Sequence, residues 1–239
     1  MQYKVYLKRR LIIVATLVLT LLVYAVIKST LLVAAQNDSA NDKKVILIDP
    51  GHGGYDGGAE GKSGIKEKDI NLKISLKLKD ILEAKGFNVV MTREDDRALL
   101  NDGKRIGTKK AQDIANRCKI KQDSNADAFI SIHQNHFPQG KYYGSQVWYS
   151  KSKGSSELAR ITQENLKIDI NAENKRVEKP ARDDYKILTC SDIMPSILVE
   201  CGFLSNYEEE KLLQDENYQQ KIADSLAKSI GNYLENNKN

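Results

Sequence analysis

Short apolar runs rich in β-branched residues alternate along this chain with longer amphipathic segments, and this alternation constrains the fold more than any other feature. Strands are expected at VILID (45–49), FNVVM (87–91), AFISI (128–132), SQVWYS (145–150), KILTC (186–190) and SILVE (196–200). Hydrophobic residues at helical spacing predict helices over residues 66–85, 106–118, 155–170 and 216–234. This order predicts an α/β fold of three layers, in which a mostly parallel, twisted sheet of about six strands carries helices on both faces.

The N-terminal part of the chain reads as a membrane segment. Residues 11–27 carry no charge, and as a helix they would span about 26 Å, close to the thickness of a bilayer core. Four basic residues precede this run, which predicts that the rest of the chain lies on the extracytoplasmic side. We therefore expect an anchor or signal segment over 1–35, a polar linker over 36–43 and a catalytic domain over 44–239. Whether the segment is retained or cleaved near Ala35 stays open.

The positive charge belongs to this N-terminal part. The formal net charge is +5, and residues 1–35 hold five basic residues and no acidic one. Of the 37 basic and 32 acidic residues, 32 of each sign are therefore left for residues 36–239, and no nucleic-acid partner is expected. Three scattered cysteines also argue against a disulfide scaffold and against a thiolate zinc site.

Chemistry-bearing residues follow three of the expected strands. His52 follows VILID within a glycine-rich loop, His133 follows AFISI, and SILV ends in Glu200. Glu67 opens the first helix directly after the glycine-rich loop. Because ligands gather at the carboxyl ends of parallel strands, we expect these four residues to meet at one edge of the sheet.

Two imidazoles and one carboxylate form a typical three-ligand zinc site, which leaves one coordination position open for water. We expect His52, Glu67 and His133 to hold one Zn²⁺ per chain. Zinc lowers the pKa of bound water and polarises a carbonyl, so a second carboxylate is needed to move the proton to the leaving group. Glu200 is the candidate for that role, and the chemistry that this set suits is amide hydrolysis.

The motifs resemble those of one enzyme family. The segments VILIDPGHGGYDGGA (45–59), EKDINL (67–72), VVMTRE (89–94), ADAFISIHQN (126–135) and PSILVECGFLSN (195–206) resemble the zinc-dependent N-acetylmuramoyl-L-alanine amidases of bacterial cell walls, of the amidase-3 type. The resemblance implies cleavage of the amide between N-acetylmuramic acid and the L-alanine of the peptidoglycan stem peptide. It also implies the zinc ligands His52, Glu67 and His133, and the catalytic residue Glu200.

An anchor and one catalytic domain, without wall-binding repeats, resemble the CwlD-type amidases of spore formers. That resemblance implies a role in spore cortex maturation and germination, with a general vegetative autolysin of the same chemistry as the alternative. Because Glu67 follows a glycine-rich loop, the hypothesis extends to a protein partner that orders the loop and activates the enzyme.

Three further residues are candidates for contact with the substrate or for support of the metal ligands. Asn135 follows His133 by two positions and should share its side of the strand; the alternative is a turn-capping role. His136 stands where the family often has a small residue, and it is either a substrate or metal contact or an exposed loop residue. Arg117 either binds a carboxylate of the stem peptide or forms a surface salt bridge.

Two other functions compete with the zinc amidase. A cysteine hydrolase would use Cys201 with His133 or His136, although no segment resembles a Cys–His protease motif. An inactive, anchored peptidoglycan-binding protein is the alternative from a different class, and the intact set of four candidate residues argues against it.

Overall fold

The computed structural model describes residue 16 and residues 19–29, 43–101 and 107–237. The chain divides into two units, residues 1–43 and 44–239. In the first unit residues 19–29 are helical, and much of the predicted membrane segment at 11–27 lies outside the described residues. Across the described parts of the chain, no helix combines the length and the hydropathy that a bilayer crossing requires.

The second unit is built from short strands and longer helices. The strands are β1 (Val45–Pro50), β2 (Asn88–Met91), β3 (Ala128–Asn135), β4 (Gln146–Tyr149), β5 (Lys179–Pro180) and β6 (Ser196–Phe203). The helices are α2 (Glu67–Ala84), α3 (Lys109–Asp123), α4 (Ser155–Asp169), α5 (Lys186–Thr189), α6 (Tyr207–Gln214) and α7 (Glu216–Asn236).

The strands form one six-stranded sheet in the order β2-β1-β3-β6-β4-β5. Strands β2, β1, β3 and β6 are parallel, so their carboxyl ends share one edge. β4 runs antiparallel to β6, and β5 is parallel to β4. The prediction of an α/β fold with a six-stranded sheet is confirmed, and the sheet is mixed because β4 and β5 reverse direction.

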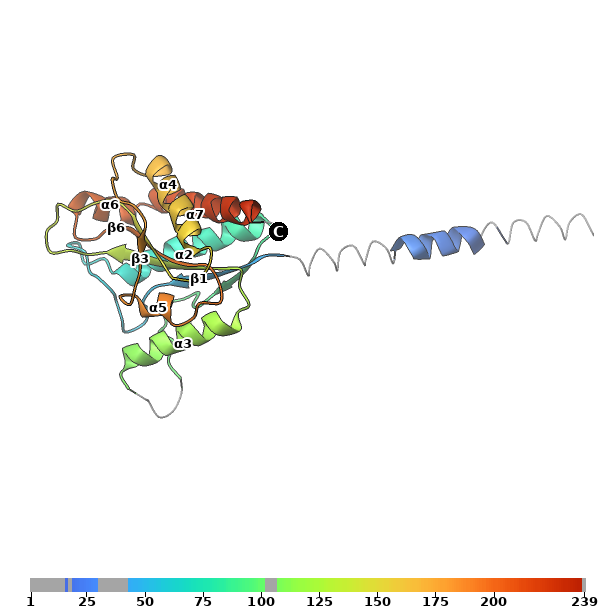
Figure 1. Ribbon diagram of the computed structural model, residues 1–239, viewed down its shortest axis with the longest axis horizontal. Helices are drawn as coiled ribbons and strands as arrows, with labels where there is room; N and C mark the ends of the chain where they lie inside the picture. The colour runs from blue at the N-terminus through green and yellow to red at the C-terminus, as the bar shows by residue number, and fades with distance from the viewer. Residues whose placement is uncertain (1–15, 17–18, 30–42, 102–106, 238–239) are drawn as a thin grey trace, which may run out of the picture. The chain divides into compact units, whose positions relative to one another are not determined.

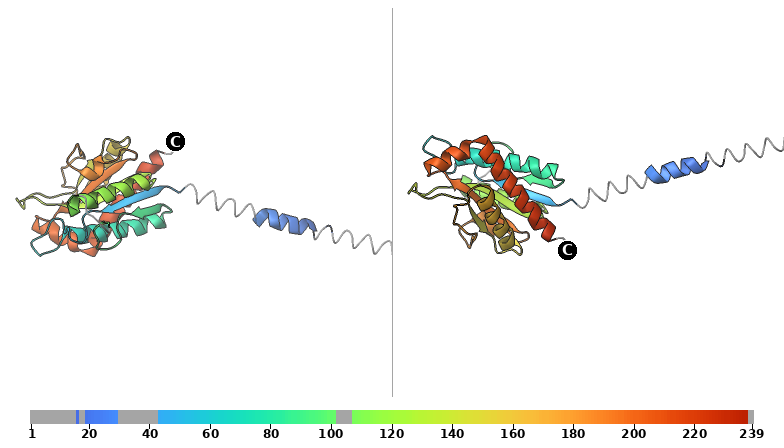
Figure 2. Two further views of the ribbon diagram at one scale, coloured as in Figure 1. Left: turned by 90° about the horizontal axis from the view of Figure 1, so that it is seen from below. Right: turned by 90° about the horizontal axis from the view of Figure 1, so that it is seen from above.

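Helices cover both faces of the sheet. Helices α2, α4 and α7 lie on one face, and α3 with α5 lies on the other (Figure 1). The two views of Figure 2 show α3 across one face and α7 with α2 and α4 across the other. The sheet is thus the middle of three layers.

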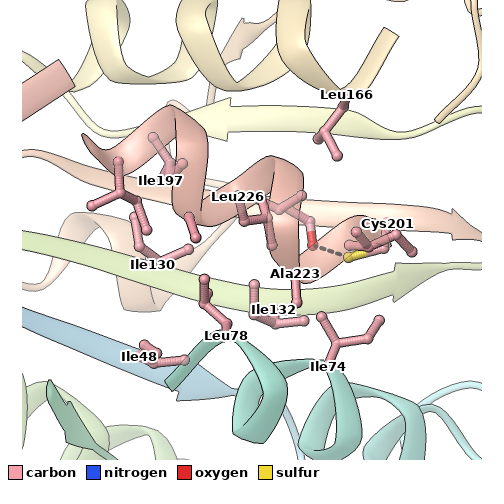
Figure 3. Close-up of a cluster of buried hydrophobic side chains, with 14 of the residues drawn as sticks. Ile48, Ile74, Leu78, Ile130, Ile132, Leu166, Ile197, Cys201, Ala223 and Leu226 are labelled. Carbon is pink, nitrogen blue, oxygen red and sulfur yellow. Dashed lines mark hydrogen bonds between the residues drawn. The ribbon is translucent and has the colours of Figure 1, made fainter. Parts of the chain in front are cut away.

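Alternation along the central strands explains these layers. Ile46 and Ile48 of β1 point into the larger core with α2, α4 and α7, whereas Leu47 between them points into the smaller core with α3 and α5. Figure 3 shows the larger core, where side chains of β1, β3 and β6 meet those of α2 and α7. A strand buried on both faces reads as an uninterrupted apolar run, which is what VILI is.

The prediction of a strand over 186–190 is wrong. Residues Lys186–Thr189 form the one-turn helix α5, and the sixth strand is instead β5. In a strand Ile187 and Leu188 would face opposite sides, but both side chains are buried in the smaller core. A segment of four residues with two apolar side chains fits a strand or a helix equally well, and here tertiary packing selects the helix.

Two of the three cysteines form a pair that the sequence did not predict. Cys118 of α3 and Cys190, directly after α5, form a disulfide across 72 residues of sequence, and Cys201 is free and buried. One bridge is no disulfide scaffold, but it fixes α5 to α3 on the smaller-core side of the sheet.

Candidate metal centre

Three side chains that the sequence singles out converge at the edge where the parallel strands end. His52 lies in the loop after β1, Glu67 is the first residue of α2, and His133 belongs to β3. One ligand atom of each lies within 4.8 Å of the other two. The pairing of β1 with β3 brings them together, because the N–H of Gly51 donates to the carbonyl of Ile132 at 2.9 Å.

Glu67 lies between the two imidazoles. Its Oε1 is 2.9 Å from Nδ1 of His133, and its Oε2 is 3.2 Å from Nε2 of His52. The backbone N–H groups of Gln134 and Ala59 donate to these same two oxygens at 3.0 and 2.8 Å. Burial alone would raise the pKa of Glu67, but the hydrogen bonds and charges of the two histidines hold it well below its usual value. The carboxylate is therefore ionised at neutral pH and suited to a cation.

His52 has a second acidic neighbour. Its Nδ1 lies 3.0 Å from Oδ2 of Asp56, four residues further along the glycine-rich loop. Burial alone would lower the pKa of His52, but Glu67 and then Asp56 raise it to about 9. A carboxylate on the far nitrogen orients the ring and makes it a better donor to a metal.

Two glycines make room for this group of side chains. A Cβ on Gly51 would lie 2.2 Å from both Cε1 and Nε2 of His133. A Cβ on Gly58 would lie 2.5 Å from Oε2 of Glu67, and the φ of Gly58 is +68°, a conformation that side chains disfavour. Glycine is therefore required at these two positions by the close approach of the histidine and glutamate side chains.

Two buried arginines hold the backbone of the loop that carries His52. Arg93 donates to the carbonyls of Pro50 and Gly51 at 3.0 and 2.9 Å. Arg117 donates to the carbonyl of His52 at 2.6 Å and pairs with the carboxylates of Asp49 and Asp113. The expectation of a surface salt bridge for Arg117 is wrong, because its side chain is only 4% exposed. Its guanidinium instead binds the backbone of the His52 loop.

Glu200 lies at the same edge. It pairs in register with His133 across β3 and β6, and both residues line one cavity of about 340 Å³ together with His52 and Glu67. Burial, first of all, raises the pKa of Glu200 to about 7; the charge of His133 opposes this shift, and that of Glu67 adds to it. A carboxyl group with such a pKa can both accept and release a proton near neutral pH.

The remaining candidates lie elsewhere. His136 is exposed, and neither His136 nor Asn135 is among the residues that line this cavity. The pairing of β3 with β6 shifts register between His133 and Asn135, so the simple alternation that placed Asn135 beside His133 does not carry through. Gln134 lines the cavity instead.

Two residues of the site, Asp56 and Tyr185, were not predicted from the sequence because the signal for each was weak. Asp56 stands four positions after His52, a spacing that offers a second carboxylate but is common in loops. Tyr185 lines the cavity from the segment before α5, and nothing in its sequence context indicates this.

The chemistry of this set is that of a metal-assisted hydrolase. Two imidazoles and an ionised carboxylate can hold a divalent ion, and no cysteine is near enough to complete a closed, structural site within the described residues. Glu200 places a second carboxyl group in the same cavity, where a group able to transfer a proton would suit such chemistry.

Comparisons with known proteins show which proteins this chain is similar to. Residues 46–232 match the family model described as N-acetylmuramoyl-L-alanine amidase. The chain is 38% identical over 194 residues to a germination-specific N-acetylmuramoyl-L-alanine amidase of Bacillus subtilis, a match that covers 80% of each chain. It is similar to the CwlD amidase of Clostridioides difficile, solved in complex with the GerS lipoprotein, with a TM-score of 0.78, 46% identity and coverage of 82% of this chain and 100% of that one. For an N-acetylmuramoyl-L-alanine amidase of Clostridium difficile 630 the TM-score is 0.70, the identity 32% and the coverage 83% and 100%.

Proposed function

The chain belongs to the N-acetylmuramoyl-L-alanine amidase family, and from this membership we propose that it uses zinc to hydrolyse the amide between N-acetylmuramic acid and the L-alanine of the stem peptide. The observation that carries the proposal is the convergence of His52, Glu67 and His133 within 4.8 Å, in a cavity that Glu200 also lines. Peptidoglycan is the substrate that this bond implies.

The three residues fit a zinc ion by their chemistry. Glu67 brings a negative charge, the two histidines bring neutral nitrogen donors once deprotonated, and Asp56 supports His52 from its far nitrogen. When bound, a zinc ion supplies a Lewis acid that polarises the amide carbonyl and acidifies water.

The chain's own residues then carry the proton. Glu200 accepts a proton from the attacking water through its carboxylate and releases it to the nitrogen of the leaving L-alanine. Its pKa of about 7 suits both steps, because the group is partly ionised at neutral pH and partly able to donate. Arg93 and Arg117 keep the His52 loop in place during the reaction through their bonds to backbone carbonyls.

The test uses defined muropeptides, mass spectrometry of the products and zinc analysis of the same protein sample. The wild-type enzyme should release stem peptides, lose this activity with a chelator and regain it with added zinc. Glu200→Gln should retain zinc and lose turnover by about a hundredfold or more. Glu208→Gln, at an exposed position in the first turn of α6, is the matched control. Near-normal turnover by Glu200→Gln, or activity indifferent to metal, contradicts the proposal.

We further propose that the substrate is spore cortex peptidoglycan. The support is similarity to a relative named germination-specific and to a CwlD amidase. The alternative, a vegetative autolysin of the same chemistry, predicts equal rates on both materials. Cortex fragments cleaved no faster than vegetative ones would favour that alternative.

For location, we propose a catalytic domain on the extracytoplasmic side, carried there by the segment at residues 1–35. The support is the uncharged run at 11–27 with basic residues before it. Protease added to intact cells or protoplasts should digest the domain. Protection equal to that of a cytoplasmic marker would contradict this location.

A protein partner that activates the enzyme is also part of the proposal. Its support is that the similar CwlD amidase was solved in complex with the GerS lipoprotein. A partner of this kind should raise the zinc occupancy or the rate of hydrolysis. Equal values with and without the partner would contradict an activating role.

A further inference from the structure

One wall of the active-site cavity is formed by the segment between β5 and β6. Asp184, Tyr185, Lys186 and Ile187 of this segment line the cavity. Tyr185 is the residue before α5, and its hydroxyl lies 3.5 Å from Oε1 of Glu200. A tyrosine hydroxyl thus reaches the carboxyl group to which the proposed function assigns proton transfer.

The two oxygens of Glu200 have different surroundings. Oε1 faces the hydroxyl of Tyr185, whereas Oε2 is buried and has no hydrogen-bond partner among residues 43–101 and 107–237. In these same residues Tyr185 is the one group that donates to the Glu200 side chain. A donor on one oxygen restricts the rotation of a carboxylate, so the hydroxyl of Tyr185 can set the orientation of the Glu200 side chain.

Three contacts hold Tyr185 in this place. Its ring packs against Trp148 with the ring centroids 5.3 Å apart. Its carbonyl accepts the N–H of Leu188 at 2.9 Å, which closes the turn of α5. At the other end of that turn, the disulfide from Cys190 to Cys118 fixes α5 to α3.

The disulfide connects this wall to the metal side of the cavity. Cys118 follows Arg117 on α3, and Arg117 donates to the carbonyl of His52. Helix α3 therefore carries two attachments, one to the loop of a proposed metal ligand and one to the segment that bears Tyr185. The disulfide restricts the distance between the two walls of the cavity.

We propose that Tyr185 is a positioning residue for Glu200 and that the Cys118–Cys190 disulfide holds it in place. The inference rests on the proposed function, because it gives Tyr185 a role only if Glu200 moves the proton. The hydroxyl aligns the carboxylate in the ground state and hydrogen-bonds to its charged form. At 3.5 Å the bond is long, so the rate effect that we expect from it is no more than about tenfold.

The first test replaces the hydroxyl alone. Tyr185→Phe keeps the ring and its contact with Trp148, so a packing role would leave this variant like the wild type. We expect kcat to fall about tenfold, with KM within about twofold and zinc content unchanged. Tyr149→Phe, which removes a hydroxyl from β4 outside the cavity lining, is the matched control.

The second test addresses the disulfide. The Cys118→Ala/Cys190→Ala double variant should lower kcat in the wild-type background and have little further effect in the Tyr185→Phe background, because both changes act on the same hydroxyl. If the variant does not fold, reduction of the wild-type disulfide by a phosphine gives the same comparison, with zinc content measured in parallel.

The outcomes separate this inference from the function on which it rests. A wild-type protein that releases no stem peptide overturns the proposed function and this inference with it. An active wild type matched by Tyr185→Phe in kcat overturns only the role of Tyr185. The effect of breaking the disulfide is compared in the wild-type and Tyr185→Phe backgrounds. An equally large loss of kcat in both overturns the role of the disulfide.

Discussion

Replacing Gly51 by alanine should disable the proposed metal centre through one methyl group. The new Cβ would lie 2.2 Å from Cε1 and from Nε2 of His133, and 2.7 Å from Cδ2 of the same ring. Carbon atoms in van der Waals contact are about 3.5 Å apart or more, so the ring would have to withdraw by about 1.3 Å. The backbone of Gly51 has no positive φ, so the effect of alanine is steric and is not a backbone strain.

A displacement of that size exceeds what the site tolerates. Metal–ligand distances vary by only about 0.2 Å, and a misplacement of about 1 Å commonly costs about a hundredfold in rate. His133 also lies 2.9 Å from Glu67 through Nδ1, so the shift would disturb two of the three proposed ligands. We therefore expect zinc content to fall well below one per chain and activity to fall about a hundredfold.

The assay combines zinc analysis, muropeptide hydrolysis and thermal unfolding. Gly231→Ala is the control, because this glycine lies within α7 and a Cβ there meets nothing within 4 Å. That variant should keep its activity and gain about 1 kcal/mol of stability from helix propensity. Full zinc occupancy and wild-type activity in Gly51→Ala would refute the assignment of His133 and the reasoning from its close approach.

Three further predictions follow from the charges around the site. Asp56→Asn should weaken zinc binding by about ten- to a hundredfold, measured by competition with a metal-binding dye, because it removes the carboxylate at Nδ1 of His52; unchanged affinity would contradict that role. Zinc affinity of the wild type should rise with pH up to about 9, because the pKa of His52 is raised to about 9 and the metal displaces its proton. Calorimetry in buffers of different ionisation enthalpy should detect the released protons. The free energy of unfolding should fall at acid pH as Asp49 is protonated. Burial alone would raise the pKa of Asp49, but Arg117, Thr92 and Ser131 lower it from 3.8 to about 2. The ionised carboxylate therefore contributes about 2 kcal/mol of stability above pH 3.8, and this contribution is lost as the pH falls to about 2. Urea unfolding of Asp49→Asn should lack this part of the acid dependence, and an identical pH profile would contradict it.

Residues that stand at the ends of buried strands were accessible from the sequence. VILID, AFISI and SILVE are short, mostly apolar runs, and each is followed or ended by a residue that the folded chain brings to the cavity. The inference works because parallel strands end at a common edge, so order along the chain predicts proximity in space. The strands predicted at residues 128–132 and 196–200 were placed correctly, but each ends three residues further on, at Asn135 and Phe203, so His133 and Glu200 lie within their strands.

Elements whose identity depends on distant partners were not accessible. KILT is a helix because Ile187 and Leu188 are both buried in the smaller core, and four residues carry too little periodicity to show it. The direction of β4 depends on the path of the loop before it, and the pairing of Cys118 with Cys190 depends on where α3 and α5 pack. The helix α6, capped by the side chain of Asn206, was missed for its short length.

By itself the sequence determined which residue types meet at the sheet edge. Strand propensity and glycine-rich loops are local properties, and the order of the strands along the chain is read directly from the sequence. Only the tertiary structure decided how that meeting is held. Arg93 and Arg117 lie far along the chain from the backbone carbonyls that they bind, and Tyr185 reaches Glu200 through a turn that a disulfide fixes. Such contacts join segments through packing, and neither composition nor periodicity encodes the distance between them.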